Sequence, residues 1–280
     1  MSLPWGQRTA VMGVINITPD SFSDGGLHLV PERALAQARR MVAMGVDLLD
    51  LGAQSTRPGA DDVGVEEERR RLLPVLQLIA AAIASAEFPP ELLISVDTFH
   101  AAVAEAALAA GADWINDVRG GSARRDPAMA SLVAASGCCY VLTHSRGDSA
   151  GMDALATYHD VVTEVRAELE QATDQLLAEG VEPGQILWDP GLGFAKTTEQ
   201  NLELLRRLPE LAIAGYPLLV GPSRKRFIGA VLEQPNPRQR LWGTAAVCAQ
   251  AIARGADVLR VHDVGPIVQV ARMSDALWRG

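Results

Sequence analysis

The sequence is poor in cysteine and has no segment apolar enough to cross a membrane. Only three cysteines occur in 280 residues, the adjacent Cys138 and Cys139 and the distant Cys248. Their spacing fits neither a zinc site nor a disulfide framework, so we expect a reducing cytoplasmic setting. The start, MSLPWGQR, lacks the apolar core of a signal peptide, and no apolar run is long enough to span a bilayer. We therefore expect no membrane partner.

Positive charge is also in deficit. The chain has 25 Lys and Arg residues against 34 Asp and Glu, which gives a formal net charge of −9. Such a balance argues against a nucleic-acid partner or an anionic membrane surface. It remains compatible with a small anionic ligand, because a site can be locally basic on an acidic protein.

Several common catalytic and nucleotide-binding motifs are missing. No G-x-G-x-x-G follows the first apolar run, and the segment Gly221-Pro-Ser-Arg-Lys225 does not match the G-x-x-x-x-G-K phosphate loop. The chain has no Ser-His-Asp order, no paired catalytic glutamates, and no H-x-x-H or C-x-x-C spacing. The sequence therefore favours a site that holds its ligand over one that uses a side-chain nucleophile.

What the chain does have is one pattern repeated eight times: a short apolar run, a polar residue, a loop and a longer helix-like segment. The apolar runs are Val11–Ile15, Val46–Leu51, Leu92–Val96, Trp114–Val118, Cys139–Leu142, Ile186–Trp188, Leu218–Val220 and Val258–Val261. The helix-like segments are Pro31–Met44, Val65–Ala86, Ala101–Ala109, Pro127–Ala135, Ala154–Glu179, Glu199–Arg207, Arg238–Arg254 and Gly265–Leu277. Eight βα units without a linker predict an α/β protein, a single (β/α)8 TIM-barrel domain over residues 1–280. A doubly wound open sheet is the alternative.

A polar residue ends every apolar run. These residues are Asn16, Asp50, Asp97, Asn116-Asp117, His144, Asp189, Ser223-Arg224-Lys225 and Arg260-Val261-His262-Asp263. A barrel places its active site at the C-terminal ends of its strands, so we expect these side chains to meet at one mouth. Alternation along a strand predicts that Ser223 and Lys225 point into the mouth together, as do Arg260 and His262.

Three kinds of side chain are available at this mouth. A cationic set suits a multiply charged anion such as a phosphate; its members are Arg57, Lys225, Arg260 and His262. A carboxylate and amide set suits a flat heterocycle with several N–H donors; its members are Asp97, Asn116 and Asp189. Asn16 could complete the shell of a Mg²⁺ ion that keeps most of its waters and binds substrate phosphates.

The other polar candidates have plainer interpretations. Asp50 and Asp263 are expected to be structural residues of the mouth. His144 can be either a packing or a functional residue, and the sequence leaves both open. We expect His28, His100 and His159 to be solvated, because they fall in loops or at helix starts.

Seven motifs in order resemble the dihydropteroate synthases of folate biosynthesis. They are N-I-T-P-D-S-F-S-D-G-G (16–26), S-T-R-P-G (55–59), S-V-D-T (95–98), I-N-D-V (115–118), D-P-G-L-G-F-A-K (189–196), G-P-S-R-K-R-F-I-G (221–229) and R-V-H-D-V (260–264). The resemblance implies a transferase that joins 6-hydroxymethyl-7,8-dihydropterin diphosphate to p-aminobenzoate and releases pyrophosphate. Members of the family are commonly dimers, so it also implies a homodimer.

The resemblance assigns roles residue by residue. The implied pterin-pocket residues are Asp97, Asn116, Asp189 and Lys225. The implied diphosphate residues are Asn16, Arg260 and His262, with Mg²⁺ bound through Asn16. The implied p-aminobenzoate residues are Phe22, Thr56, Arg57, Pro58, Phe194 and Ser223. The implied catalytic residues are Asp24, Asp97, Lys225, Arg260 and His262, with Asp24 and Asp97 stabilising a pterin methylene cation.

Two segments depart from the family pattern. Gly52-Ala53-Gln54 stands where a Gly-Gly-Glu is usual, and Thr143-His144-Ser145 replaces methionines around the histidine. Two alternatives remain: a methyltetrahydrofolate:corrinoid methyltransferase, which shares the Asp/Asn/Asp set but needs no diphosphate pocket, and a catalytically silent synthase paralogue. The intact motifs at 16–26 and 55–59 argue against the second.

Overall fold

Every predicted apolar run overlaps a parallel β-strand in the structure, a computed structural model that describes residues 3–18, 30–55, 62–122, 125–147 and 151–279. The strands are β1 (Ala10–Asn16), β2 (Leu48–Gly52), β3 (Leu93–Asp97), β4 (Trp114–Asp117), β5 (Cys139–Thr143), β6 (Ile186–Asp189), β7 (Leu219–Val220) and β8 (Val258–Val261). They form one sheet in the order β6-β5-β4-β3-β2-β1-β8-β7. The ends of this sheet approach each other through a bridge between Trp188 and Leu218. The result is a nearly closed barrel, as predicted.

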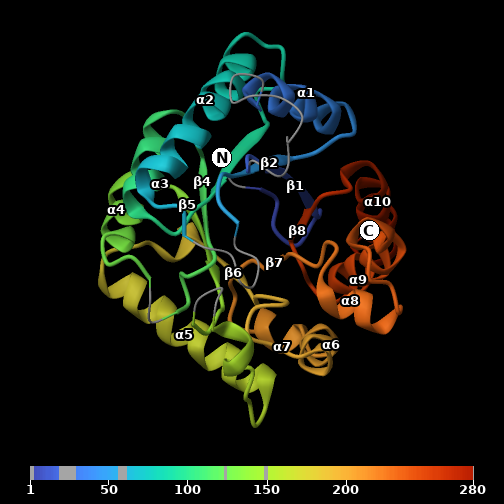
Figure 1. The fold of residues 1–280 in the computed structure, drawn as a ribbon. Helices are drawn as coiled ribbons and strands as arrows, with labels where there is room; N and C mark the ends of the chain where they lie inside the picture. Colours follow the sequence, from blue (N-terminus) through green and yellow to red (C-terminus); the bar gives the residue numbers. More distant parts are fainter. Residues whose placement is uncertain (1–2, 19–29, 56–61, 123–124, 148–150, 280) are drawn as a thin grey trace.

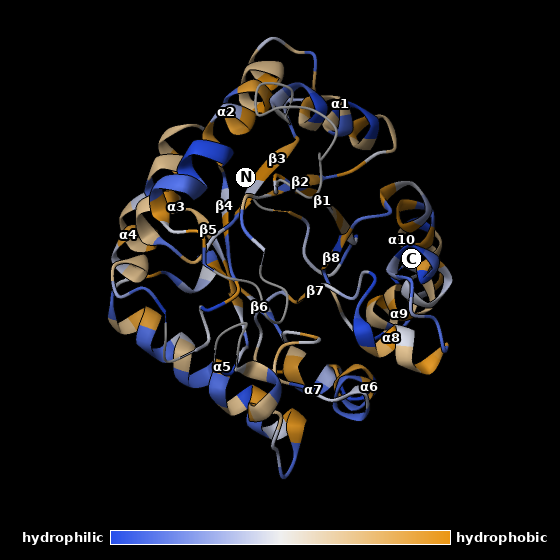
Figure 2. Ribbon diagram, viewed as in Figure 1, coloured by the Kyte–Doolittle hydropathy of each residue, from blue (hydrophilic) through white to orange (hydrophobic). Residues whose placement is uncertain are grey.

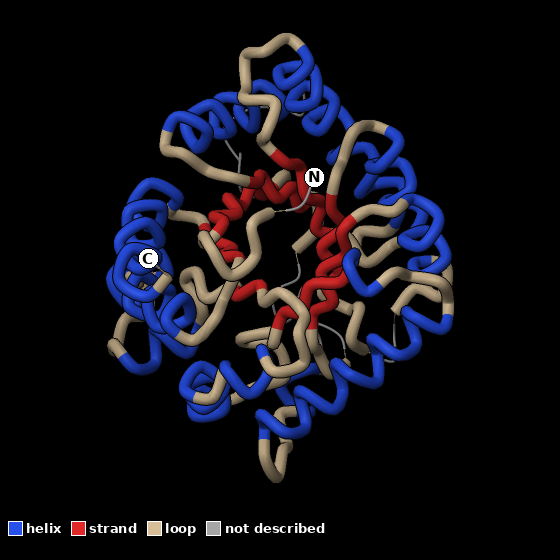
Figure 3. Tube along the Cα trace, turned by 180° about the vertical axis from the view of Figure 1, so that it is seen from behind, coloured by secondary structure: helices blue, strands red, loops and turns tan. Residues whose placement is uncertain are grey.

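The helices surround the strands on all sides (Figure 1; Figure 3, seen from behind). The α-helices are α1 (Val30–Ala43), α2 (Val65–Ala84), α3 (Ala101–Ala109), α4 (Met129–Ser136), α5 (Val161–Ala178), α6 (Thr198–Arg206), α7 (Pro209–Ala212), α8 (Arg226–Val231), α9 (Leu241–Ala253) and α10 (Val264–Trp278). In the part of the chain that the structure describes, no helix combines the length and apolarity that a bilayer crossing needs.

Two apolar cores follow from the alternation along the strands. Outward-facing side chains such as Leu49 and Ile94 pack against the helices, whose apolar sides appear in Figure 2. Inward-facing side chains such as Met12, Leu48 and Trp114 fill the barrel interior. Two residues further along β2 and β3, the inward positions become polar, as at Asp50 and Ser95. The barrel is thus apolar inside at its N-terminal end and polar toward its C-terminal end.

Some predicted helix boundaries were wrong. The segment expected to be helical from Ala154 begins its α-helix only at Val161, because the Asp160 side chain accepts hydrogen bonds from the Val162 and Thr163 amides and caps the helix there. The helix expected from Arg238 begins at Leu241. The short helices α7 and α8 were not predicted, since their few residues carry little periodicity.

Candidate active site

The described strand-end residues gather at one rim of the barrel. Asn16, Asp97 and Asp189 are the last residues of their strands, and Asn116 lies one residue before the end of β4. Backbone register places Asp97 beside Asn116 and Thr143 beside Asp189. Five predicted site residues lie outside the described residues and stay predictions: Phe22, Asp24, Thr56, Arg57 and Pro58.

Arg260 joins three strands across the barrel interior. Its Nε donates to Asp50 Oδ2 at 2.6 Å, and its Nη2 donates to Asp97 Oδ2 at 2.5 Å. Asp50 is fully buried and also accepts from Ser95 Oγ at 2.7 Å. Burial raises the pKa of Asp97 to about 7, an effect that the positive charge of Arg260 opposes. Asp50 is structural, as expected, and Arg260 places a positive charge between β2 and β3 in the barrel interior.

Two buried side-chain oxygens near Arg260 have no hydrogen-bond partner among the described residues. They are Asp97 Oδ1 and Asn116 Oδ1, on neighbouring strands. Unpaired buried acceptors are costly and need a donor from a ligand or water. The second residue of the Asn116-Asp117 pair behaves differently. Asp117 turns outward and accepts from the hydroxyl of Tyr140 at 2.7 Å, so it belongs to the outer packing layer.

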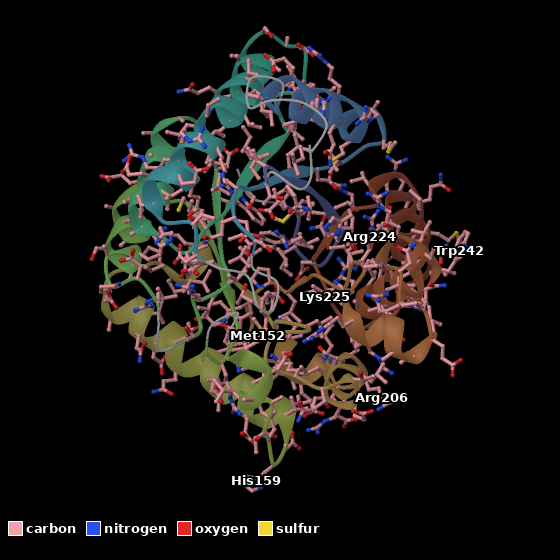
Figure 4. All side chains as sticks on the ribbon, in the orientation of Figure 1. Met152, His159, Arg206, Arg224, Lys225 and Trp242 are labelled. Carbon is pink, nitrogen blue, oxygen red and sulfur yellow. The ribbon has the colours of Figure 1, made fainter. Side chains whose placement is uncertain are left out.

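Asp189 and Lys225 are the next two charged residues of the site, and the charges of Asp189 and Asp97 both act on Lys225. Asp189 Oδ1 accepts from the Gly191 amide at 2.8 Å, which leaves Oδ2 to accept from a ligand. Burial raises the pKa of Asp189 and lowers that of Lys225 to about 8, with the Asp189 charge favouring the ammonium. The Lys225 ammonium lies 4.3 Å from the centre of the Phe194 ring. In Figure 4, Lys225 lies close to the barrel mouth and Trp242 lies at the molecular edge.

The strand alternation that was expected to orient Ser223 and Lys225 was wrong. Strand β7 ends at Val220, so Ser223 and Lys225 lie on a turn in which alternation does not apply. Arg260 points to β2 and β3, whereas His262 Nδ1 lies 3.0 Å from Ser223 Oγ. The structure therefore brings His262 to Ser223.

Ion pairs and one buried arginine hold this turn in place. Arg224 has a φ of 60° and makes a bidentate pair with Asp263, at 3.0 and 2.6 Å. This contact bears out the structural role expected of Asp263. Arg240, almost completely buried, donates to the carbonyls of Arg224 and Lys225 at 3.0 and 3.4 Å. Sequence reasoning missed Arg240, which lay within a segment expected only to be helical.

The other four histidines include three that the structure describes, and these three differ from one another. His144 is fully buried, with Nε2 3.0 Å from Glu168 Oε2 and Nδ1 2.8 Å from Lys196 Nζ. Burial lowers its pKa to about 4. His100 was expected to be solvated, but its Nε2 lies 3.1 Å from Asp62 Oδ1 in a largely covered position. His159 is exposed, as expected, and His28 lies outside the described residues.

Lys196 was missed by the sequence reasoning although it ends a quoted motif. The signal was available in composition: Lys196 and Lys225 are the only two lysines of the chain. Gln54, one of the departures from the family pattern, accepts from the Val63 amide at 3.1 Å through Oε1. This hydrogen bond joins the residues that stand directly before and after the segment 55–62.

The fold and this rim define a barrel with a cluster of buried polar and charged side chains at the C-terminal ends of its strands. The model of the family described as pterin binding enzyme matches residues 12–262. The dihydropteroate synthase of Synechocystis is 48% identical over 275 residues, which cover 98% of this chain and 92% of that protein.

Solved structures of dihydropteroate synthases have the same fold as this chain. Dihydropteroate synthase from Clostridium difficile, determined in the presence of pteroic acid, has a TM-score of 0.90 and 40% identity, with both chains fully covered. The Xanthomonas albilineans dihydropteroate synthase with 4-aminobenzoic acid has a TM-score of 0.88 and 43% identity, covering 97% of this chain and 94% of that one. The chain belongs to the pterin-binding enzymes and, among them, to the dihydropteroate synthases, which are transferases of folate synthesis.

Proposed function

We propose that the chain condenses 6-hydroxymethyl-7,8-dihydropterin diphosphate with p-aminobenzoate to give 7,8-dihydropteroate and pyrophosphate. The observation that carries this proposal is the pair of unpartnered buried oxygens, Asp97 Oδ1 and Asn116 Oδ1, in a pocket that also holds Asp189. Three neighbouring acceptors suit the N–H donors of a pterin ring. The relatives that bind pteroic acid and 4-aminobenzoic acid support the same substrates.

The residues proposed to bind the pterin ring all lie within the described part of the chain. Asp189 would accept from the ring N–H and the 2-amino group, with Lys225 beside it donating to the carbonyl oxygen. Burial raises the pKa of Asp97 to about 7. Pterin donors directed at its Oδ1 would favour the charged form, because hydrogen bonds to a carboxylate lower its pKa.

The diphosphate would be held by Asn16, Arg260 and His262. We propose that Mg²⁺ binds here through Asn16. Among the described residues no cluster of three His, Cys, Asp or Glu side chains could hold a metal ion. One neutral oxygen ligand fits a Mg²⁺ held mainly by water and substrate phosphates. When bound, the ion neutralises part of the charge that develops on departing diphosphate.

In the reaction, the C–O bond to diphosphate breaks with its electron pair, and the methylene carbon becomes a cation delocalised into the pterin. The amine lone pair of p-aminobenzoate then forms the C–N bond, and one proton leaves the nitrogen. The amine is already neutral near pH 7, so no general base has to activate it. The Asp97 carboxylate would stabilise the cation, His262 and Arg260 would offset the leaving charge, and we assign Asp24 to the same role as Asp97.

A coupled pyrophosphate assay tests this proposal. We expect purified protein to release pyrophosphate from the pterin diphosphate only when p-aminobenzoate is present. Equal release without p-aminobenzoate would indicate a diphosphatase. No release under any condition, together with intact pterin binding, would indicate a silent paralogue.

We also propose that the protein works as a homodimer in the cytoplasm. Val231, Leu232 and Trp242 leave apolar side chains exposed on α8 and α9, Trp242 to 79%. Gly243, which follows Trp242, packs beside Leu232, so α9 presents Trp242 next to the end of α8, on a surface that a second copy could cover. Sedimentation should give the mass of a dimer, and Trp242→Glu should shift it toward the monomer. Trp278→Glu, on the exposed end of α10, is the control.

A further inference from the structure

Lys196 is a buried cation whose hydrogen-bonding capacity is fully used. Its Nζ lies 2.8 Å from His144 Nδ1 and donates to the carbonyl oxygens of Gly191 and Phe194 at 3.1 and 3.0 Å. The residue is 6% exposed. An ammonium group has three N–H donors, and here each one has an acceptor.

The loop that Lys196 holds has an unusual backbone. Gly191, Gly193 and Ala195 all have positive φ values, of 66°, 78° and 48°. A Cβ at Gly191 would lie 1.9 Å from the carbonyl oxygen of His144, so the loop passes directly against β5. Such a conformation, with a non-glycine residue in the left-handed region, persists only where surrounding contacts stabilise it.

Both ends of this loop reach the pterin site. Asp189 begins it and accepts from the Gly191 amide at 2.8 Å. Near its end, the Phe194 ring lies 4.3 Å from the Lys225 ammonium. Between them, Gly193 packs against the Lys225 side chain, since a Cβ there would lie 3.1 Å from Lys225 Cδ. The shape of residues 190–195 therefore decides where the Asp189 carboxylate and the Phe194 ring lie.

We propose that Lys196 is a positioning residue for the pterin site, whose ammonium group holds residues 190–195 in the conformation that directs Asp189 and Phe194 at the ligand. His144 supplies the third acceptor for the Lys196 ammonium group. Its Nε2 faces the carboxylate of Glu168 at 3.0 Å, so Nε2 carries the proton and Nδ1 is left to accept from Lys196. The proposal rests on the proposed function, because it assumes a pterin ligand.

Protonation of Lys196 should matter for this role. Burial lowers its pKa to about 7; the charges of Asp189 and Glu168 oppose this effect, and those of Lys225 and Arg146 add to it. His144 also faces the ammonium and is neutral near pH 7, because its own pKa is about 4. A neutral Lys196 amine has only two N–H donors for its three acceptors, so its lone pair would face one of them. One of the three hydrogen bonds is then lost.

Binding and steady-state kinetics of Lys196→Met test the proposal. We expect the Kd for pteroic acid and the KM for pterin diphosphate to rise at least about tenfold, as loss of charge-assisted hydrogen bonds does. The resemblance gives p-aminobenzoate a single residue of this loop, Phe194, so its KM should rise less than the KM for pterin diphosphate. In wild type, pteroic acid affinity should fall as pH rises through the Lys196 pKa, and the variant should lack this component. Unchanged pterin constants, or an equal rise for both substrates, would overturn the proposal.

His144 offers a matched pair of variants in case Lys196→Met does not fold. Asn at this position can present Oδ1 where Nδ1 was, whereas Leu offers no acceptor. We expect His144→Asn to bind pteroic acid nearly as wild type does, and His144→Leu to bind at least about tenfold more weakly. Equal affinities in the two variants would refute the role. If wild type itself fails to bind pteroic acid, the proposed function is wrong.

The two-lysine composition gives a direct readout as well. Protein labelled with ¹³C-lysine should show only two ε-methylene signals, which Lys225→Met assigns. We expect the Lys196 signal to titrate near neutral pH and its pKa to rise on addition of pteroic acid, because the ligand selects the loop held by the ammonium. A Lys196 pKa that the ligand leaves unchanged or lowers would contradict the proposal.

Discussion

Replacing Asp189 by Asn tests pterin recognition most sharply. Asp189 Oδ1 accepts from the Gly191 amide, so an Asn side chain must keep its single oxygen there. Its NH₂ group then replaces Oδ2 on the side that faces the ligand. A pterin N–H that meets this NH₂ group is left without an acceptor, at a cost of about 1–3 kcal/mol. That cost corresponds to a loss of roughly 10- to 100-fold in pterin affinity.

Isothermal titration with pteroic acid measures this loss. Asp174→Asn is a matched control, because Asp174 is exposed on α5 far along the chain from the strand ends. We expect the control to bind as wild type does. If Asp189→Asn also binds as wild type does, Asp189 is not the recognition residue and the pterin pocket must be reassigned.

Three further predictions concern the metal, the order of binding and stability. Turnover should require Mg²⁺ or Mn²⁺, and Asn16→Ala should weaken metal-dependent diphosphate binding while leaving the melting temperature nearly unchanged; full rates in excess chelator would refute this. p-Aminobenzoate should bind weakly to the empty protein and well with magnesium pyrophosphate present, because ordering the segments 18–26 and 55–59 costs about 1–2 kcal/mol per residue; equal affinities in the two titrations would mean a preformed pocket. Glu68 is buried with its pKa raised to about 7, so its folded state prefers the protonated form and stability falls as pH rises from about 4.5 to 7. Glu68→Gln should therefore unfold at higher denaturant than wild type at pH 8 but not at pH 4, and the reverse order would contradict the assigned cause.

The strands and the rim could be predicted because their signals are local. Apolar runs that end in Asn16, Asp97 or Asp189 need only alternation and a barrel to place those side chains at one edge. The contacts between distant residues could not be predicted in the same way. Arg260 and Asp50 are 210 positions apart, and their ion pair depends on the registers of β1, β2 and β8.

Turn geometry was the other source of error. The sequence suggested that Ser223 and Lys225 continue strand alternation, but proline flanks β7 at Pro217 and Pro222 and the strand is only two residues long. The left-handed φ of Arg224 then rotates the turn so that Ser223 meets His262. Lys196 escaped notice for a related reason, since its three acceptors come from a loop conformation that no periodicity encodes.

The central claim is that this protein forms a C–N bond between a pterin methylene carbon and an arylamine. Mass spectrometry after incubation with pterin diphosphate and ¹⁵N-labelled p-aminobenzoate tests it most directly. The account predicts ¹⁵N-labelled 7,8-dihydropteroate in a one-to-one ratio with pyrophosphate. Pyrophosphate accompanied by 6-hydroxymethyl-7,8-dihydropterin and no labelled product would contradict it, because the protein would then be transferring the pterin to water.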